Sequence, residues 1–118
     1  MKKTTGLEHL IKSTGYSLKG LKSAVQNETA FRHELFACCI LLPLAFWLAK
    51  DKIELVLMIG SVLLVLVAEL LNSAIEAVVD RIGTEHHELS GRAKDQGSAA
   101  VFVAMMIVLI TWGIILFA

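Results

Sequence analysis

This chain contains little cysteine and little proline, and neither positive nor negative charge is in excess. Its 118 residues include two cysteines and one proline, and eleven Lys and Arg side chains offset eleven Asp and Glu, giving a formal net charge of +0. The cysteines, Cys38 and Cys39, are adjacent and pair poorly with each other, and the chain offers no third partner, so we expect no disulfide framework. We also expect no nucleic-acid partner.

Glycine-rich phosphate-binding loops are absent as well. Neither the motif GxxxxGKS/T nor a kinase glycine-rich loop occurs, so any nucleotide site here does not belong to those two folds. A zinc site is not expected either, because His86 and His87 are neighbours in sequence and this spacing is poor for chelation from one helix face. These histidines suit a solvated loop or nucleotide contacts.

What the chain does contain is long apolar runs. Hydrophobic residues make up 56% of it and its mean hydropathy is +0.69, whereas soluble domains are roughly 45–50% apolar. We therefore expect an all-α membrane protein with a single domain over residues 1–118. Three apolar stretches predict transmembrane helices at about residues 30–49, 53–79 and 98–118, with a polar loop at 81–97 between the last two.

The segment 6–27 has a different pattern. Its apolar residues recur at intervals of three and four, which predicts an amphipathic helix. Other faces of that helix carry Lys12, Lys19 and Lys22, and a helix with lysines of this kind suits the membrane interface. The apolar positions are Leu7, Leu10, Ile11, Thr14, Leu18, Leu21 and Val25.

The distribution of lysine and arginine predicts the orientation in the membrane. Nine of these residues precede or open the first span or follow the second, and only Lys50 and Lys52 lie between the two spans. Because positive charges mark cytoplasmic segments, the N-terminus and the 81–97 loop are expected in the cytoplasm. The nine are Lys2, Lys3, Lys12, Lys19, Lys22, Arg32, Arg81, Arg92 and Lys94.

One face of the segment 69–80 is polar although the sequence around it is apolar. Five polar residues are spaced there so that they share a helical face. A charged side chain at the centre of a bilayer costs at least about 2.5–3.5 kcal/mol, so carboxylates in such a run indicate a function. We interpret this stripe as a metal-binding and catalytic site at the membrane surface. It consists of Glu69, Asn72, Ser73, Glu76 and Asp80.

The carboxylates suit different tasks. Mg²⁺ is commonly held by one or two carboxylates together with substrate phosphates, and Glu76 fits that role, with Glu28 as a candidate second ligand. Glu69 lies about 10 Å deeper at 1.5 Å per residue. A carboxylate at that depth can accept a proton from a hydroxyl group presented by the bilayer. Asn72, between the two, can donate an amide hydrogen bond to either.

The polar loop adds a candidate for phosphate contact. Lys94 can neutralise phosphate oxygens, and Asp95 can pair with it or orient it.

Taken alone, these residues leave several alternatives open. The glutamates could be only polar links between helices, the chain could be a small proton-coupled exporter, or it could be a structural oligomerisation protein.

Two blocks of sequence resemble a known family. They are GYSLKGLKSAVQNETAFRHE and AELLNSAIEAVVDRIGTEHHELSGRAKDQGSAAV, the second of which contains E-x-x-N-S-x-I-E-x-x-x-D. Both resemble the bacterial integral-membrane diacylglycerol kinases, with matching spacing from about Thr4 to Trp112. The resemblance implies an inner-membrane homotrimer with one interfacial helix and three transmembrane helices per subunit. It also implies Mg²⁺-dependent transfer of the ATP γ-phosphate to the primary hydroxyl of diacylglycerol, giving phosphatidic acid.

The resemblance implies a role for each matching residue. Glu69 is similar to the general base, Glu28 and Glu76 to the Mg²⁺ ligands, and Asn72 to a supporting polar group. The implied nucleotide contacts are His9, Tyr16, Glu28, Glu76, Glu85, His86, His87, Lys94 and Asp95. The implied lipid-site or pocket positions are His9, Ser17, Ala30, Arg32, Glu34, Trp47, Glu69, Ser98 and Trp112.

Four positions depart from the family pattern. His9 replaces a common Arg, which implies a weaker or pH-dependent phosphate contact, and His86 replaces a Tyr. Leu18 and Val25 replace tryptophans that are expected on the interfacial helix. Within the family the alternative function is an undecaprenol kinase, but the SGRAKD loop and the three-span pattern favour diacylglycerol as the acceptor.

Overall fold

The computed structural model describes residues 6–83 and 85–118, and these fold into helices joined by short connections. Three of the helices are long and apolar enough to cross a membrane, which confirms the all-α class and the three candidate spans. Lys2 and Lys3, which contribute to the predicted orientation, lie outside the described residues. The helices are α1 (Gly6–Asn27), α2 (Thr29–Leu48), α3 (Lys52–Ile82) and α4 (Glu88–Phe117).

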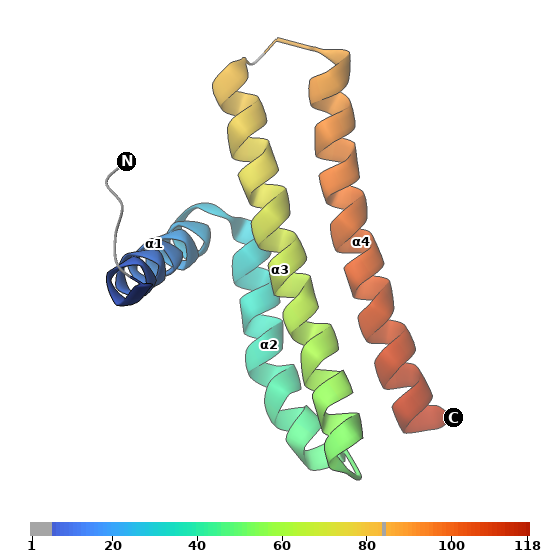
Figure 1. Cartoon of the computed structure of the whole chain (residues 1–118). Helices are drawn as coiled ribbons and strands as arrows, with labels where there is room; N and C mark the ends of the chain where they lie inside the picture. The colour runs from blue at the N-terminus through green and yellow to red at the C-terminus, as the bar shows by residue number, and fades with distance from the viewer. Residues whose placement is uncertain (1–5, 84) are drawn as a thin grey trace.

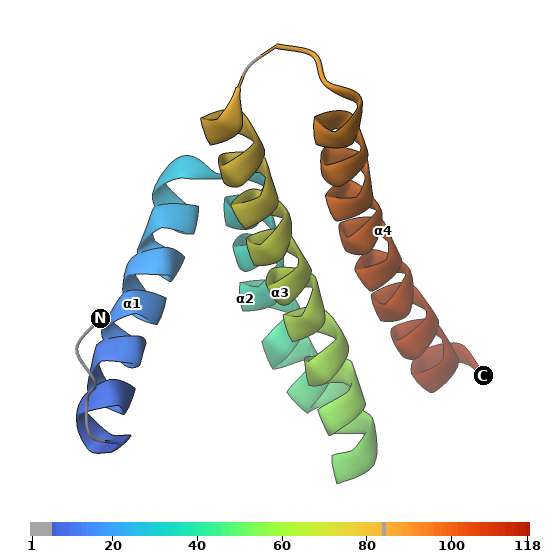
Figure 2. The ribbon, with the colours of Figure 1, turned by 45° about the horizontal axis from the view of Figure 1, so that its top comes forward.

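The helices form an open bundle with one arm. Helices α3 and α4 run antiparallel and side by side, and α2 packs along α3 from the turn that joins them (Figure 1). Helix α1 turns away from the other three at its connection to α2, and the second view shows the same separation (Figure 2). The segment 6–27 is thus a helix as predicted, and its place at the membrane interface stays a prediction.

Small and branched side chains hold α3 and α4 together. Their shared core consists of Val65 and Ala68 on α3 and Val101 and Ala104 on α4. Since this core contains only short side chains, the two helices can approach closely there, as small residues permit in membrane bundles. Nearer the C-terminus, the Trp112 indole Nε1 donates a 3.2 Å hydrogen bond to a backbone carbonyl of α3.

The connection between α2 and α3 is a capped turn. Asp51 precedes α3, and its Oδ1 accepts a 2.8 Å hydrogen bond from the Glu54 backbone N–H. The Glu54 carboxylate in turn accepts a 2.9 Å bond from the Lys50 N–H. These bonds satisfy N–H groups that a helix start would otherwise leave unpaired, so α3 starts directly after α2.

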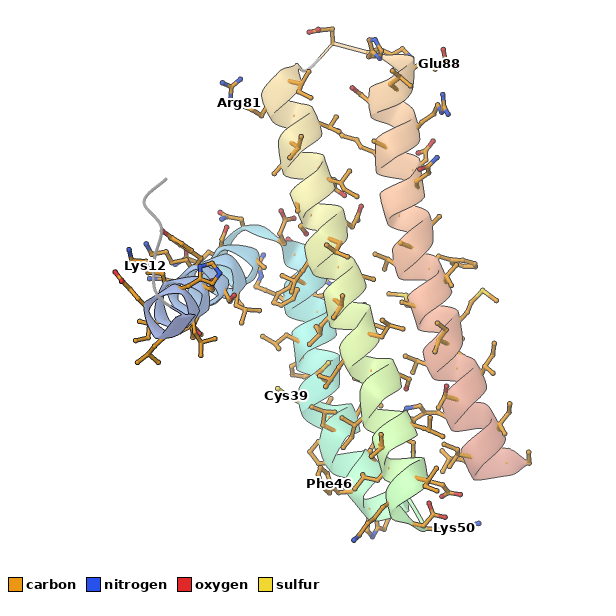
Figure 3. The ribbon with its side chains drawn as sticks, in the orientation of Figure 1. Lys12, Cys39, Phe46, Lys50, Arg81 and Glu88 are labelled. Carbon is orange, nitrogen blue, oxygen red and sulfur yellow. The ribbon has the colours of Figure 1, made fainter. Side chains whose placement is uncertain are left out.

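Helices α3 and α4 are longer than α2, and the difference positions the polar residues. Helix α2 has 20 residues, whereas α3 and α4 have 31 and 30. At 1.5 Å per residue, the longer pair extends about 15 Å past the start of α2. Figure 3 shows Arg81 and Glu88 at this projecting end and Lys50 at the other. Counted from the α2–α3 turn, Glu69 is about level with the start of α2, while Glu76 and Asp80 lie beyond it.

The prediction of a polar loop over residues 81–97 is wrong. Helix α3 continues to Ile82 and α4 begins at Glu88, so the connection is residues 83–87. The His87 side chain caps α4, because its Nδ1 accepts a 3.1 Å hydrogen bond from the Leu89 N–H. Gly83 is the C-terminal cap of α3, whereas Gly91 and Gly97 lie inside α4, because a glycine inside a helix costs only about 1 kcal/mol. Since this part of α4 projects past α2, its polar side chains are exposed without leaving the helix.

Candidate functional site

Glu69 and three carboxylates within its electrostatic range form what we call the carboxylate cluster. Glu69 of α3 is buried, with 5% of its surface exposed. Three other carboxylates act on it electrostatically: Glu34 of α2 most strongly, then Glu76 of α3 and Glu28 of the α1–α2 connection. Like charges in an environment of low dielectric constant repel strongly, so this cluster favours a proton or a cation as a partner. The sequence grouped Glu69 with Glu76 and Glu28, and Glu34 joins them here.

The donor atoms of this cluster suit a hard cation. Carboxylate oxygens are the protein ligands that Mg²⁺ prefers, and one or two suffice when substrate phosphates complete the shell. Within the part of the chain that the structure describes, no three His, Cys, Asp or Glu side chains converge to hold a metal ion. The role of Glu28 and Glu76 as two ligands of an ion shared with a phosphate stays a prediction.

The α1–α2 junction fixes the position of Glu28. Its backbone N–H donates to the Ala24 carbonyl at 2.9 Å, which closes α1, and its carbonyl accepts from the Arg32 N–H at 3.1 Å, which opens α2. Glu28 itself has an extended backbone, with φ −116° and ψ 108°. It is thus the one non-helical link between two helices, and its carboxylate starts from the bend.

Arg32 clamps this junction. Its guanidinium Nη1 donates to the carbonyls of Val25, at 2.8 Å, and Gln26, at 3.2 Å. Its Nη2 donates to the Thr29 hydroxyl at 3.0 Å. A cation that bonds to the last carbonyls of a helix stabilises that end. Arg32, predicted as a lipid-site position, therefore bonds to α1 and to the first turn of α2 on either side of Glu28.

Two pockets border the carboxylates. One, of about 510 Å³, lies between α1 and α3 and is lined mostly by small side chains, with Ser17, Glu28 and Ser73 among them. The other, of about 330 Å³, lies among α2, α3 and α4 and is apolar except for Glu34. Ser17 and Glu34, both predicted as lipid-site positions, thus line cavities beside the cluster.

A third pocket lies at the projecting end of α3 and α4. It has a volume of about 330 Å³, and its lining brings together four predicted nucleotide contacts. Asp80, which the sequence put on the polar stripe without a role, lines it too, and its Oδ1 lies 2.8 Å from the Lys94 Nζ. Lys94 therefore pairs with Asp80, whereas the sequence had suggested Asp95 as a residue that could pair with Lys94 or orient it. The four contacts are Glu85, His86, His87 and Lys94.

Lys94 also connects this pocket to the carboxylate cluster. Besides its ion pair with Asp80, it interacts electrostatically with Glu76. Glu76 in turn acts on Glu69. The sequence signal for Asp80 was its position four residues after Glu76 on the same polar stripe.

Other predicted residues lie apart from these pockets in the single chain. His9 and Tyr16 are exposed on α1, and the Tyr16 ring has the Lys19 Nζ 5.9 Å from its centroid. Ala30, Asp95 and Ser98 are exposed on α2 and α4. Trp47 is 80% exposed near the C-terminal end of α2.

Trp112 lies far from Glu69, and Asn72 lacks the hydrogen bond that was expected of it. Trp112 donates to the Met58 carbonyl, eleven residues and about 16 Å along α3 from Glu69. Asn72 makes no hydrogen bond to Glu69 or Glu76 within the described residues, and its Oδ1 is buried without a partner. The predicted roles of both residues stay predictions.

Comparisons with known proteins agree on one family. The sequence matches the prokaryotic diacylglycerol kinase family over residues 15–116. It is 73% identical to the diacylglycerol kinase of Haemophilus influenzae over 117 residues, covering 99% of both chains. It is 57% identical to that of Escherichia coli K12 over 115 residues, or 98% of this chain and 94% of the relative. The diacylglycerol kinase of Pseudomonas aeruginosa is 50% identical over 112 residues, or 95% of this chain and 91% of the relative. The chain therefore belongs to the prokaryotic diacylglycerol kinase family.

Proposed function

We propose that this chain is an ATP-dependent kinase that phosphorylates the primary hydroxyl of diacylglycerol and yields phosphatidic acid. Its family and the activity for which its relatives are named support this reaction. The observation that carries it is the buried Glu69 carboxylate, which has three other carboxylates within electrostatic range, while Lys94 lines a pocket farther along α3 toward its C-terminal end. This arrangement supplies a proton acceptor at the depth of a lipid hydroxyl and charged groups on the side of the phosphates.

Glu69 acts as the general base in this proposal. The lipid hydroxyl oxygen attacks the γ-phosphorus of ATP, the bond from that phosphorus to the β–γ bridging oxygen breaks, and ADP leaves. The proton of the hydroxyl passes to Glu69. Phosphoryl transfer needs mainly positioning and neutralisation of charge, and the burial of Glu69 keeps water away from the acceptor.

Glu28 and Glu76 hold Mg²⁺ in this proposal. The bound ion would neutralise charge on the phosphate oxygens. The Arg32 clamp keeps Glu28 at the bend between two helices. Glu76 extends from the part of α3 that projects past α2. The two carboxylates thus approach from different elements, which suits an ion that also binds a substrate.

The nucleotide occupies the pocket at the projecting end. Lys94 contacts the phosphates, and Asp80 orients Lys94 through their 2.8 Å ion pair. Glu85, His86 and His87 line the same pocket. Asp95 completes the predicted contacts from the exposed face of α4.

The active form is a homotrimer in the bacterial inner membrane, with the N-terminus and the site on the cytoplasmic side. One subunit leaves His9 and Tyr16 exposed on α1, apart from the pocket at the end of α3 and α4. A site shared between subunits would bring these residues to the nucleotide. Exposed apolar side chains on the spanning helices supply surfaces for both lipid and a neighbouring subunit.

The decisive experiment is lipid-dependent transfer of radiolabelled γ-phosphate by the purified protein in mixed micelles. With diacylglycerol, the parent protein should give labelled phosphatidic acid, and the Glu69→Gln variant should give none. Undecaprenol is tested in the same preparation, and faster labelling of that lipid would assign the chain to polyprenol phosphorylation. Absence of any labelled lipid would support the exporter or structural alternatives, neither of which needs ATP.

A further inference from the structure

Gly97 of α4 is buried against the amide of Asn72 on α3. A Cβ built on Gly97 would overlap the Asn72 Oδ1 and would lie 3.3 Å from its Cγ and 3.6 Å from the Ile75 Cδ1. The Oδ1 atom is buried and has no hydrogen-bond partner within the described residues. The Asn72 amide therefore occupies the volume that any side chain at position 97 would need.

The backbone of Gly97 does not explain why a glycine stands there. Gly97 lies inside α4, and no described glycine has a positive φ. The two other glycines of α4, Gly91 and Gly113, would meet nothing within 4 Å if a Cβ were added. What distinguishes Gly97 from them is the space that it leaves for Asn72.

A methyl group at position 97 would change the orientation of the Asn72 amide more than the packing of the two helices. Replacing Gly by Ala inside a helix ordinarily stabilises it by roughly 1 kcal/mol. The atom in the way is the end of a side chain, which can rotate while the two helices stay where they are. The cost would thus fall on the orientation of Asn72, three residues after Glu69 and four before Glu76.

We propose that Gly97 is a positioning residue of the kinase reaction and acts through Asn72. The missing side chain lets the Asn72 Oδ1 lie against α4. Because the two branches of an amide diverge from Cγ, its Nδ2 donors then point away from Gly97, on a helix whose face at this level also carries Glu69 and Glu76. This inference rests on the proposed function.

The test is Gly97→Ala, with Gly113→Ala as a matched control on the same helix. Diacylglycerol phosphorylation and thermal unfolding in detergent are measured for both. A displacement of about 1 Å at a reacting centre can cost up to 10²-fold, so kcat of Gly97→Ala should fall by about 10- to 100-fold. Its KM values and its Tm should stay near those of the parent protein. Gly113→Ala should keep the parent kcat.

A double variant tests the route through Asn72. In Asn72→Ser the shorter side chain leaves room for a methyl group at position 97. Residues that act through one another are non-additive, so adding Gly97→Ala to Asn72→Ser should lower the remaining kcat by less than about twofold.

Several results would overturn the inference. They are a parental kcat for Gly97→Ala, a lowered Tm for that variant, and losses that multiply in the double variant. If the parent protein and Gly113→Ala both fail to phosphorylate diacylglycerol, the proposed function fails first and the inference falls with it. If both are active and only the Gly97→Ala prediction fails, the proposed function is unaffected.

Discussion

Helix α3 buries one polar residue in each half, and the two differ in their polar neighbours. Ser61, in the half 52–68, is 6% exposed, and its hydroxyl donates a 2.8 Å hydrogen bond to the Met58 carbonyl of its own helix. Glu69, in the half 69–82, is 5% exposed, and its charged neighbours are carboxylates. The first half pairs its polar group locally, whereas the second leaves its polar group to a proton, a cation or a substrate.

The same contrast extends to the contacts with α4. In the first half, the Met58 carbonyl also accepts the hydrogen bond from Trp112. In the second half, the Asn72 Oδ1 faces Gly97 without a partner. Buried polar groups in folded proteins are nearly always hydrogen-bonded. The unpaired Asn72 Oδ1 therefore distinguishes the second half of α3, which also carries the proposed site.

The largest effect is expected from Glu76→Gln. Removing this charge should abolish Mg²⁺-dependent phosphorylation, since Glu76 is one of two proposed ligands, while the protein stays folded and assembled. Activity across a Mg²⁺ titration, with size-exclusion chromatography alongside, measures both properties. Glu88→Gln, an exposed glutamate in the first turn of α4, is the control. Near-normal turnover of Glu76→Gln would remove Glu76 from the metal site.

An intermediate effect is expected from Arg32→Leu. Losing the clamp frees Glu28 at the α1–α2 bend, so the KM for MgATP should rise by roughly fivefold, equivalent to about 1 kcal/mol. Arg32→Lys should recover only part of this loss, because an ammonium group lacks the fork that reaches two carbonyls and a hydroxyl. The KM for diacylglycerol should not change, and Arg81→Leu is the control. A rise in the lipid KM alone would instead assign Arg32 to the lipid site.

The smallest effect is expected from Ser61→Ala. The Met58 carbonyl keeps the Trp112 hydrogen bond, so the loss of stability should be less than about 1 kcal/mol. Phosphorylation should proceed at the parent rate. Thermal unfolding and kcat measure the two halves of this prediction. If Ser61→Ala lowered kcat strongly while leaving Tm unchanged, the division of α3 into two halves would be mistaken.

The sequence predicted the helices better than the contacts between them. Apolar run length indicates the spans, because a bilayer requires about 20 apolar residues, and the spacing on residues 69–80 grouped Glu69 with Glu76. The start of α4 was missed because its polar residues resemble a loop until their position beyond α2 is known. The Lys94–Asp80 pair and the Gly97–Asn72 contact depend on the register of α3 against α4. The Arg32 clamp depends on the bend at Glu28. No local sequence pattern encodes the register of α3 against α4 or this bend.

Glu69→Asp tests the central claim, that the buried carboxylate of α3 takes the proton of the lipid hydroxyl. The shorter side chain withdraws the carboxylate by one methylene, and general-base catalysis is worth about 10²–10⁴-fold, so kcat should fall within that range. Affinity for ATP and Mg²⁺ should change little, and Glu54→Asp in the other half of α3 should leave kcat intact. The contradicting result is weakened nucleotide binding with kcat preserved, which would place Glu69 in the ATP site and require another base.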